Sequence, residues 1–411
     1  MKKIFIITVF ALLSLTSYAQ TKKAVFIIID GVSKDVLEKL NAPNITAISK
    51  QGALISAYQG GERGKFNQTP TISAPGYNNV ITGVWFHKHN VPDNNIKAPN
   101  YNYPTVFRLL KNTYPEKKIG IFSSWQDNRT KLVGEGLQQT GGIQFDYKFD
   151  GLELDTVKFP HDKGSKYMAK VDQAVADAAA SVIKEKAPDL SWVYLQHTDD
   201  MGHRHGDSKQ YDESILDADR QIGQIWEAVK LRQQKFNEDW LIIVTTDHGR
   251  DPKTGHHHGG QSDRERGSWI STNSKLLNTY AKKGNASVVD ILPTLANHLN
   301  LPLSADQKRE LDGVSLIGNV SVSNPEVNYV DGKATLTWLS QNDSGKVKIW
   351  FSKSNNYKLT GRPDEYKLIG EVPLKDGKFV LDLNKDSASP IYKIAIEGQS
   401  NTVNRWIINS K

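Results

Sequence analysis

The sequence predicts an α/β fold, a mostly parallel sheet sandwiched by helices, followed by a C-terminal all-β sandwich. From about residue 22 to 318, short apolar segments alternate with longer helical stretches, as in parallel strands joined by crossover helices. From about residue 321, short segments alternate apolar and polar residues, which is typical of antiparallel sheets with one buried face. We therefore expect two folded parts, residues 20–318 and residues 319–411.

The elements of the first part follow from hydrophobic periodicity. Continuous apolar runs predict fully buried strands, and amphipathic stretches predict helices that cover the sheet. The predicted strands are residues 24–30, 117–124, 190–196 and 240–246. The predicted helices are residues 33–40, 165–186, 209–232 and 285–300, the last of them containing Pro293.

The second part reads as strands only, separated by turn signals such as Asp376-Gly377. The predicted strands are residues 333–340, 346–353, 365–372, 377–383, 391–398 and 404–410. Trp338 and Tyr392 resemble the core landmarks of fibronectin type III domains. The segment carries no cluster of catalytic residue types, so we interpret it as a packing or adhesion module. Its partner would be a glycan, another protein or the first part of the chain.

The N-terminus has the pattern of a secretory signal peptide, residues 1–19. Lys2 and Lys3 precede an apolar run over residues 4–15, and Ser17-Tyr18-Ala19 offers small residues at the cleavage site. We expect an exported protein, periplasmic or secreted. No later stretch approaches the roughly 18 apolar residues of a membrane span, so none is expected.

Composition narrows the chemistry. The chain has no cysteine, which excludes disulfides, thiolate metal sites and a cysteine nucleophile. Its formal net charge of +7 is spread along the chain rather than gathered in a basic patch. This distribution argues against binding of a nucleic-acid duplex and is compatible with a small anionic substrate.

Acids and histidines follow several of the predicted strands. Asp30 ends the first strand, Asp247 and His248 follow the fourth, and Asp199 stands four residues before His203. The carboxyl ends of parallel strands meet at one edge of a sheet, where open α/β proteins place their active sites. The segment GHHHGG offers a further histidine. Oxygen and imidazole ligands without a thiol are what a two-metal hydrolytic site needs.

A second set of candidates lies in the segment QTPTISAPGYNNVITG. The hydroxyl residues Thr69, Thr71 and Ser73 precede a helix-like stretch that runs to Thr82-Gly83. A hydroxyl at a helix N-terminus lies near backbone N–H groups that favour an anion, so it suits a nucleophile. Ser and Thr are also ordinary helix caps, and the segment alone favours a cap.

Along the chain, a strand ending in Asp30 is followed by P-T-x-[ST]-x-P, D-x-x-x-H, D-H-G and H-G. In this order, the motifs resemble the alkaline phosphatase superfamily, and most of all its nucleotide pyrophosphatase/phosphodiesterase branch, over residues 22–318. The resemblance implies that the nucleophile is Ser73, ten residues before Gly83. It also implies that Asn94, 21 residues after the nucleophile, contacts a phosphoryl oxygen. Asn95 is an adjacent alternative.

The resemblance further implies two zinc ions per chain. Asp199, His203 and one histidine of residues 256–258 would hold the first, and the family's His-Gly pattern selects His258. The second would be held by Asp30, Asp247, His248 and the oxygen of Ser73. Such a site would hydrolyse phosphate esters through a phosphoseryl intermediate.

The substrate is expected to be a small phosphate ester, possibly a nucleotide, and a diester is the first choice. In residues 123–136, Trp125 is a candidate stacking platform, although it could equally belong to the core. Arg129 and Lys131 are candidate substrate contacts, without the Lys-Asp-Arg order expected of a phosphomonoesterase. Two alternatives outside phosphate chemistry are a sulfatase, whose motif arginine is replaced by Tyr77, and a non-catalytic binding protein.

Overall fold

The structure, a computed structural model, describes residues 20–283, 286–341, 344–384 and 388–409. The predicted signal peptide, residues 1–19, lies outside the described residues. Within them, the first part of the chain forms an eight-stranded sheet in the order β4-β3-β5-β1-β6-β7-β2-β8. All neighbouring strands are parallel except β7, which runs antiparallel to both β6 and β2. The prediction of a mostly parallel sheet is confirmed.

The strands of this sheet are short and largely apolar. They are β1 (Thr21–Ile29), β2 (Ala53–Tyr58), β3 (Ile119–Ser123), β4 (Tyr147–Phe149), β5 (Leu190–Leu195), β6 (Glu238–Thr245), β7 (Gly267–Thr272) and β8 (Ala286–Ser287). The helices are α1 (Lys34–Lys39), α2 (Pro43–Gln51), α3 (Ser73–Thr82), α4 (Phe86–His89), α5 (Val106–Thr113), α6 (Lys166–Lys186), α7 (His197–His205), α8 (Lys209–Lys235), α9 (Asp263–Arg266), α10 (Thr279–Lys282), α11 (Ile291–His298) and α12 (Ala305–Glu310). Single 3-10 or π turns occur at Asn128–Val133, Gln138–Thr140, Leu152–Leu154 and Val288–Asp290.

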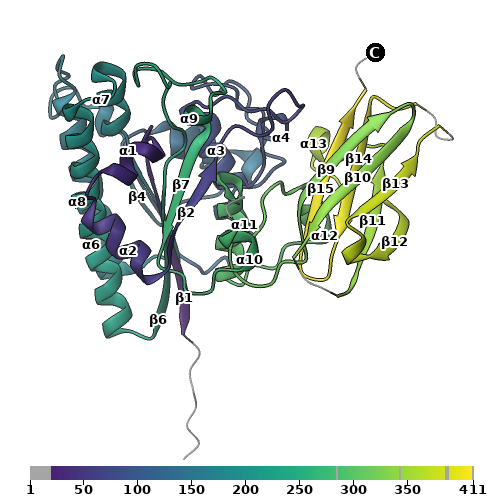
Figure 1. Cartoon of the computed structure of the whole chain (residues 1–411). Coiled ribbons are helices and arrows are strands. Elements are labelled where there is room, and N and C mark those ends of the chain that lie inside the picture. The colour runs from purple at the N-terminus through teal and green to yellow at the C-terminus, as the bar shows by residue number, and fades with distance from the viewer. Residues whose placement is uncertain (1–19, 284–285, 342–343, 385–387, 410–411) are drawn as a thin grey trace, which may run out of the picture.

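Helices cover both faces of the sheet (Figure 1). Successive side chains of a strand point to opposite faces, so β1 serves two cores. Val25, Ile27 and Ile29 join the cluster formed with α6 and α8, whereas Phe26 and Ile28 join the cluster formed with α3, α5 and α11. Burial on both faces explains why this strand appears in the sequence as an unbroken apolar run.

The helix predicted over residues 285–300 is shorter than expected. Residue 285 lies outside the described residues, Ala286–Ser287 form β8, and α11 begins only at Ile291. The side chain of Asp290 accepts hydrogen bonds from the backbone N–H of Ser287 (2.7 Å) and Val314 (2.7 Å). These bonds hold the entry to the helix as a 3-10 turn, and Pro293 is tolerated because it stands in the first turn of α11.

The C-terminal part consists of two antiparallel sheets, with strand orders β13-β10-β9 and β12-β11-β14-β15. Its strands are β9 (Val322–Val330), β10 (Lys333–Ser340), β11 (Lys346–Ser352), β12 (Lys367–Pro373), β13 (Lys378–Asp382), β14 (Ile391–Glu397) and β15 (Thr402–Ile408). A short helix, α13 (Asn356–Thr360), and a 3-10 turn, Leu374–Asp376, complete it.

Six of these strands lie where the sequence predicts them, and β9 was not predicted. Asn324 and Pro325 weaken its strand pattern, because both residue types are rare in strands. Its second half is also largely exposed, so the alternation of apolar and polar residues fades. The predicted boundary at residue 318 lies between α12 and β9. In the described part of the chain, no helix combines the length and apolarity that crossing a membrane requires.

Candidate active site

Three acids meet at the carboxyl edge of the central sheet. Asp30 directly follows β1, and Asp247 follows β6 by two residues. Asp199 stands in the first turn of α7, the helix that follows β5. Because β5, β1 and β6 are adjacent and parallel, their carboxyl ends bring these side chains together. Asp30 and Asp247 are almost fully buried.

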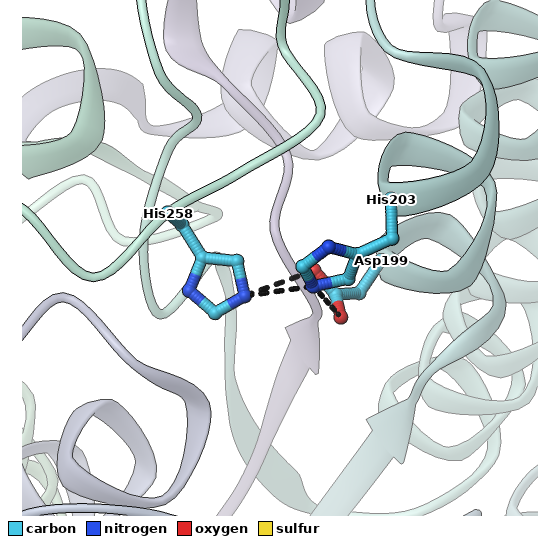
Figure 2. Close-up of side chains that lie close together, drawn as sticks. All are labelled: Asp199, His203 and His258. Atoms are coloured by element: carbon cyan, nitrogen blue, oxygen red, sulfur yellow. Dashed lines mark hydrogen bonds and ion pairs between the residues drawn. The ribbon is translucent and has the colours of Figure 1, made fainter.

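The first group of candidate ligands consists of Asp199, His203 and His258 (Figure 2). Asp199 and His203 lie one helical turn apart on the same face of α7, with His203 Nε2 3.3 Å from Asp199 Oδ2. His258 comes from the loop after β6, and its Nε2 lies 2.9 Å from His203 Nε2 and 3.7 Å from Asp199 Oδ1. The three donor atoms converge on one point, as metal ligands do.

The second group surrounds His248. Its Nε2 lies 3.4 Å from Asp30 Oδ1 and 3.2 Å from Asp247 Oδ2. Asp30, Asp199 and His248 place ligand atoms within 4.8 Å of one another, so Asp199 contributes to both groups. The predicted ligand sets assigned Asp199 to the first group alone. The rings of His248 and His258 stack with centroids 3.8 Å apart, which joins the two groups into one centre.

Three ligand atoms of this centre have no hydrogen-bond partner in the described part of the chain. Among the described residues, Asp30 Oδ1, Asp247 Oδ2 and His248 Nε2 are buried without a hydrogen bond. The other donor atom of each side chain is occupied: Tyr194 donates to Asp30 Oδ2 (2.6 Å), Gly31 N to Asp247 Oδ1 (3.1 Å), and His248 Nδ1 contacts Gly249 O (2.9 Å). Buried polar atoms without partners cost free energy, and a bound cation would remove that cost. The residues therefore fit a metal ion.

The electrostatics of the centre lead to the same conclusion. Burial, reinforced by Asp247 and Asp199, raises the pKa of Asp30 well above its usual value. Burial also raises the pKa of Asp247 to about 8 and lowers the pKa of His248. Neighbouring carboxylates in a dry pocket repel one another, and divalent cations provide the charge that lets them ionise together.

The candidate nucleophile Ser73 is the first residue of α3 and is nearly buried. Its neighbours along the chain contact the centre on two sides. His258 Nδ1 lies 2.9 Å from Thr71 O, and the Tyr77 hydroxyl donates to Asp30 Oδ2. A Cβ added to Gly76 would lie 2.8 Å from Asp247 Cβ, so the first turn of α3 packs directly against Asp247.

The hydroxyls of Thr71 and Thr69 are engaged elsewhere. Thr71 donates to Gly260 O (2.8 Å) and accepts from Gly259 N (3.0 Å), and thereby holds the loop that carries His258. Thr69 donates to Asn67 O (3.1 Å) and accepts from a backbone N–H of α4 (3.1 Å). None of the residues that the structure describes forms a hydrogen bond with the Ser73 hydroxyl. Of the three candidates, Ser73 alone presents a free hydroxyl.

Asn94 lies beside the start of α3. Its Oδ1 accepts a hydrogen bond from Ala74 N (2.9 Å), the residue after the candidate nucleophile. Asn95 instead belongs to a turn in which its backbone N–H is bound by Asp93 (2.9 Å). In the triple-histidine segment, His256 Nδ1 contacts His203 O (2.9 Å) and the backbone N–H of His257 donates to Asp251 (2.9 Å). The structure thus places Asn94 at the start of α3 and His258 in the centre.

Both predicted substrate cations are paired with carboxylates. Hydrogen bonds to Asp150 (2.6 and 2.8 Å) raise the pKa of the Arg129 guanidinium, which also pairs with Glu135. Lys131 is half-exposed and pairs with Asp127 (2.7 Å). Asp150, Glu135 and Asp127 thus compensate both charges in the folded chain. These partners were not recognised from the sequence.

Trp125 is half-buried at the end of β3. Its ring lies edge-on to that of Tyr77, with the centroids 6.2 Å apart. Tyr77 and Tyr194, which the sequence reasoning missed, both donate to the same oxygen of Asp30. Trp125 therefore stands one side chain away from a candidate metal ligand.

Arg250 is a further residue that sequence reasoning missed, although it directly follows the DHG motif. Its fully buried guanidinium pairs with the carboxylate of Asp199 and donates to Gly31 O (3.2 Å) and Asp199 O (2.8 Å). Burial tends to raise the pKa of Asp199, but Arg250 and the neighbouring histidines lower it below its usual range. Arg250 thus keeps Asp199 charged and oriented.

Asp172 on α6 also supports the site, and the sequence reasoning did not identify it. It accepts backbone hydrogen bonds from Gln196 (3.0 Å) and His197 (2.8 Å) at the start of α7. These bonds fix the helix that carries Asp199 and His203. The only signal in the sequence is an acid on the buried face of an amphipathic helix.

We predict that Gly202→Ala damages the first group of ligands. A Cβ at this position would lie 2.1 Å from the guanidinium of Arg250, so the arginine or α7 must shift. Overpacking of this kind costs about 1–3 kcal/mol, and a displaced ligand support weakens metal affinity about 10–100-fold. Chelator competition and thermal unfolding would measure both effects. The control is His205→Ala on the same helix; equal metal affinity in the two variants would contradict the prediction.

Comparison with known proteins decides the family. The sequence profile of type I phosphodiesterase / nucleotide pyrophosphatase matches residues 24–292, more than half of the chain. The chain belongs to this family. Members hydrolyse phosphoric esters, and the match contains every Asp and His of the two ligand groups, together with Ser73 and Asn94.

Curated relatives are distant and longer. An ectonucleotide pyrophosphatase/phosphodiesterase of Caenorhabditis elegans is 22% identical over 180 residues, which cover 44% of this chain and 21% of the relative. A venom phosphodiesterase of Naja atra is 24% identical over 191 residues, which cover 44% of this chain and 21% of the relative. The match thus spans about a fifth of the length of these relatives.

Solved structures share the fold. A 2-O GAG sulfatase has a TM-score of 0.50 at 11% identity, covering 89% of this chain and 86% of its own. Ps i-CgsB, solved in complex with k-i-k-neocarrahexaose, has a TM-score of 0.51 at 16% identity, and the match covers 78% of this chain and 82% of the other. At such low identity, these similarities concern the fold alone.

Proposed function

We propose that the protein is an exported phosphodiesterase or nucleotide pyrophosphatase that uses two zinc ions and a phosphoseryl intermediate on Ser73. The observation that carries the proposal is the set of buried, unpartnered ligand atoms of Asp30, Asp247 and His248. They lie beside the N-terminus of the helix that begins with a free serine hydroxyl. Family membership supplies the class of reaction.

The ligand assignment follows the two groups. Asp199, His203 and His258 would hold one ion, and Asp30, Asp247, His248 and the Ser73 oxygen would hold the other. Carboxylate and imidazole donors suit Zn²⁺. When bound, two such ions offset the charge on the attacking and leaving oxygens of an in-line displacement. Asp199 lies in both groups, so its carboxylate would be the ligand that the two groups share.

The chain's own groups then define the steps. Ser73 Oγ forms a bond to phosphorus as the ester oxygen leaves, and water later hydrolyses the phosphoserine ester. The positive end of the α3 dipole favours an anionic phosphoryl group beside Ser73, although Ala74 N–H already donates to Asn94 and Pro75 has no N–H. Because Asn94 Oδ1 already accepts from Ala74 N, its amide N–H groups are left to donate to a phosphoryl oxygen.

The preference for a diester rests on charge. A diester carries one negative charge, whereas a terminal phosphate carries nearly two at neutral pH. Arg129 and Lys131, the candidate cations for a monoester, are paired with carboxylates. Trp125, beside Tyr77, is our candidate platform for a nucleobase or another flat leaving group.

The comparison of bis-p-nitrophenyl phosphate with p-nitrophenyl phosphate tests this preference. We expect kcat/KM to be at least about tenfold higher for the diester, equivalent to about 1.4 kcal/mol of transition-state stabilisation. The Ser73→Ala variant, purified in parallel, controls for contaminating phosphatases. A higher kcat/KM for the monoester would favour the alternative, an alkaline phosphomonoesterase. Hydrolysis of a sulfate ester with calcium as the bound metal would favour a sulfatase.

Export and the nature of the second part complete the proposal. Residues 1–19 support cleavage after Ala19, so the mature protein should begin at Gln20 and be periplasmic or secreted. A three-stranded and a four-stranded antiparallel sheet support the resemblance to fibronectin type III domains. N-terminal sequencing of the exported protein would test the cleavage site, and a retained Met1 would contradict it.

A further inference from the structure

The two parts of the chain meet around Trp406 on β15, which is almost fully buried. Its ring lies parallel to that of Phe66, with centroids 6.2 Å apart and an interplanar angle of 2°. It also meets the ring of His87 edge-on at 4.7 Å. Phe66 precedes Ser73 by seven residues, and His87 follows the end of α3 by five. One side chain of the sandwich thus contacts both flanks of the helix that begins with Ser73.

Two buried lysines reinforce this contact. Lys88 on α4 donates to Asp312 Oδ1 (2.6 Å), Glu310 O (2.7 Å) and Asn404 Oδ1 (3.0 Å), the last from β15. On the sandwich side, Lys393 pairs with Glu310 (3.1 Å) and Asp364 (2.5 Å). Their ammonium groups lie 5.1 and 4.2 Å from the centroid of the Trp406 ring.

Burial of these charges makes the contact rigid. Lys88 and Lys393 are both inaccessible to solvent, and an ammonium group is costly to bury unless it is paired. Lys393 belongs to the sandwich and pairs with Glu310 of the first part of the chain. Lys88 belongs to the first part and donates to the amide oxygen of Asn404 in the sandwich. Separation of the two parts would remove partners from both lysines. We therefore expect the sandwich to stay docked rather than to swing.

The contact continues to the nucleophile helix through hydrogen bonds. His89, next to Lys88 on α4, contacts Asn79 Oδ1 on α3 through Nε2 (2.8 Å). Asp312, the partner of Lys88, accepts from Trp85 N (2.8 Å), and its own N–H donates to Gly83 O (3.0 Å) at the end of α3. Figure 1 shows α4 on the side of the α/β part that faces the sandwich.

We propose that the C-terminal sandwich is a brace for the nucleophile segment, residues 66–89, and that Trp406 is its positioning residue. Trp406 touches none of the Asp and His groups of the centre, so it acts through the segment and not on the metal ions. The aromatic ring is covered by Phe66 and His87, which leaves it unable to stack on a glycan. The link to catalysis rests on the proposed role of Ser73.

Trp406→Ala in the full chain tests the brace. We expect amide hydrogen exchange to rise over residues 66–89, while exchange in β1 and β6 stays unchanged. In the same variant, kcat for a phosphate diester should fall about 10–100-fold, because small misplacements of a reacting group are costly. KM should change little, zinc content should stay unchanged, and Trp406→Phe should restore most of kcat.

Trp338→Ala is the matched control. Trp338 is buried inside the sandwich and donates from Nε1 to Leu374 O (2.9 Å), without contact to Phe66 or His87. If it lowered kcat as much as Trp406→Ala, general destabilisation of the sandwich would explain the loss and the proposal would be overturned. Unchanged exchange over residues 66–89 in Trp406→Ala would overturn the brace whatever the activity. Faster exchange with unchanged kcat would overturn its role in the reaction. Since exchange is measured without substrate, failure of the proposed phosphodiesterase activity would be seen separately, in the wild-type assay.

Discussion

Replacement of Ser73 by alanine should lower the turnover of a phosphate diester by about 10⁴-fold or more, the range seen when a nucleophile is removed from an enzyme. The structure motivates this result because Thr69 and Thr71 use their hydroxyls in backbone hydrogen bonds, whereas that of Ser73 is free. Zinc bound by Asp199, His203 and His258 should survive the substitution. Steady-state kinetics and metal analysis of the same preparation would measure both results.

Thr71→Val is the informative control for this prediction. Because Thr71 holds the loop that carries His258, its loss should weaken zinc binding and lower activity only in proportion to the zinc lost. Restored activity at saturating zinc would fit that reading. If Ser73→Ala kept a tenth of the activity while zinc-saturated Thr71→Val was inactive, the nucleophile would be Thr71 and the spacing to Gly83 would be misleading.

Removal of the metal should abolish activity and change how stability depends on pH. The pKa of Asp247 is raised to about 8 in the folded chain, against about 3.9 for an unfolded aspartate. A raised carboxyl pKa favours folding below the unfolded value, and that contribution is lost as the pH rises towards 8. In the metal-free protein, this contribution of Asp247 should be lost as the pH rises from about 4 to 8. Buried histidines with lowered pKa values, such as His248 and His258, change stability in the opposite direction near pH 6.5, so the loss is measured as the difference between the wild type and Asp247→Asn.

Zinc should reverse this loss, since bound cations compensate the carboxylates and must compete with protons for the histidines. The increase in Tm on adding zinc should be larger at pH 8 than at pH 6.5. Asp247→Asn should reduce both the pH dependence of the metal-free protein and the zinc effect. Asp290→Asn is the control, because burial raises the pKa of Asp290 to about 7 far from the Asp and His groups. A zinc effect that was equal at both pH values would contradict the assignment of Asp247.

Much of the fold could be predicted because its signals are local. An unbroken apolar run such as residues 24–29 requires burial on both faces, which in practice means a strand inside a helix-covered sheet. The four-residue spacing of Asp199 and His203 places both on one face of a helix wherever that helix lies. The acids at strand ends could be grouped because parallel strands share one edge. The weak strand β9 and the late start of α11 were missed where Asn, Pro or a long-range hydrogen bond altered the local pattern.

The sequence by itself determined the fold class, the family and the residue types of the candidate metal centre, since these depend on periodicity, order and spacing. Only the tertiary structure decided which charges are free. Arg129 looks like a substrate cation until Asp150 and Glu135 fold against it, and Arg250 is recognisable as the partner of Asp199 only in the folded chain. Lys88 and Trp406 are 318 positions apart, yet they share one buried contact. The physical reason is that charge compensation and burial are set by neighbours in space, which local sequence patterns do not report.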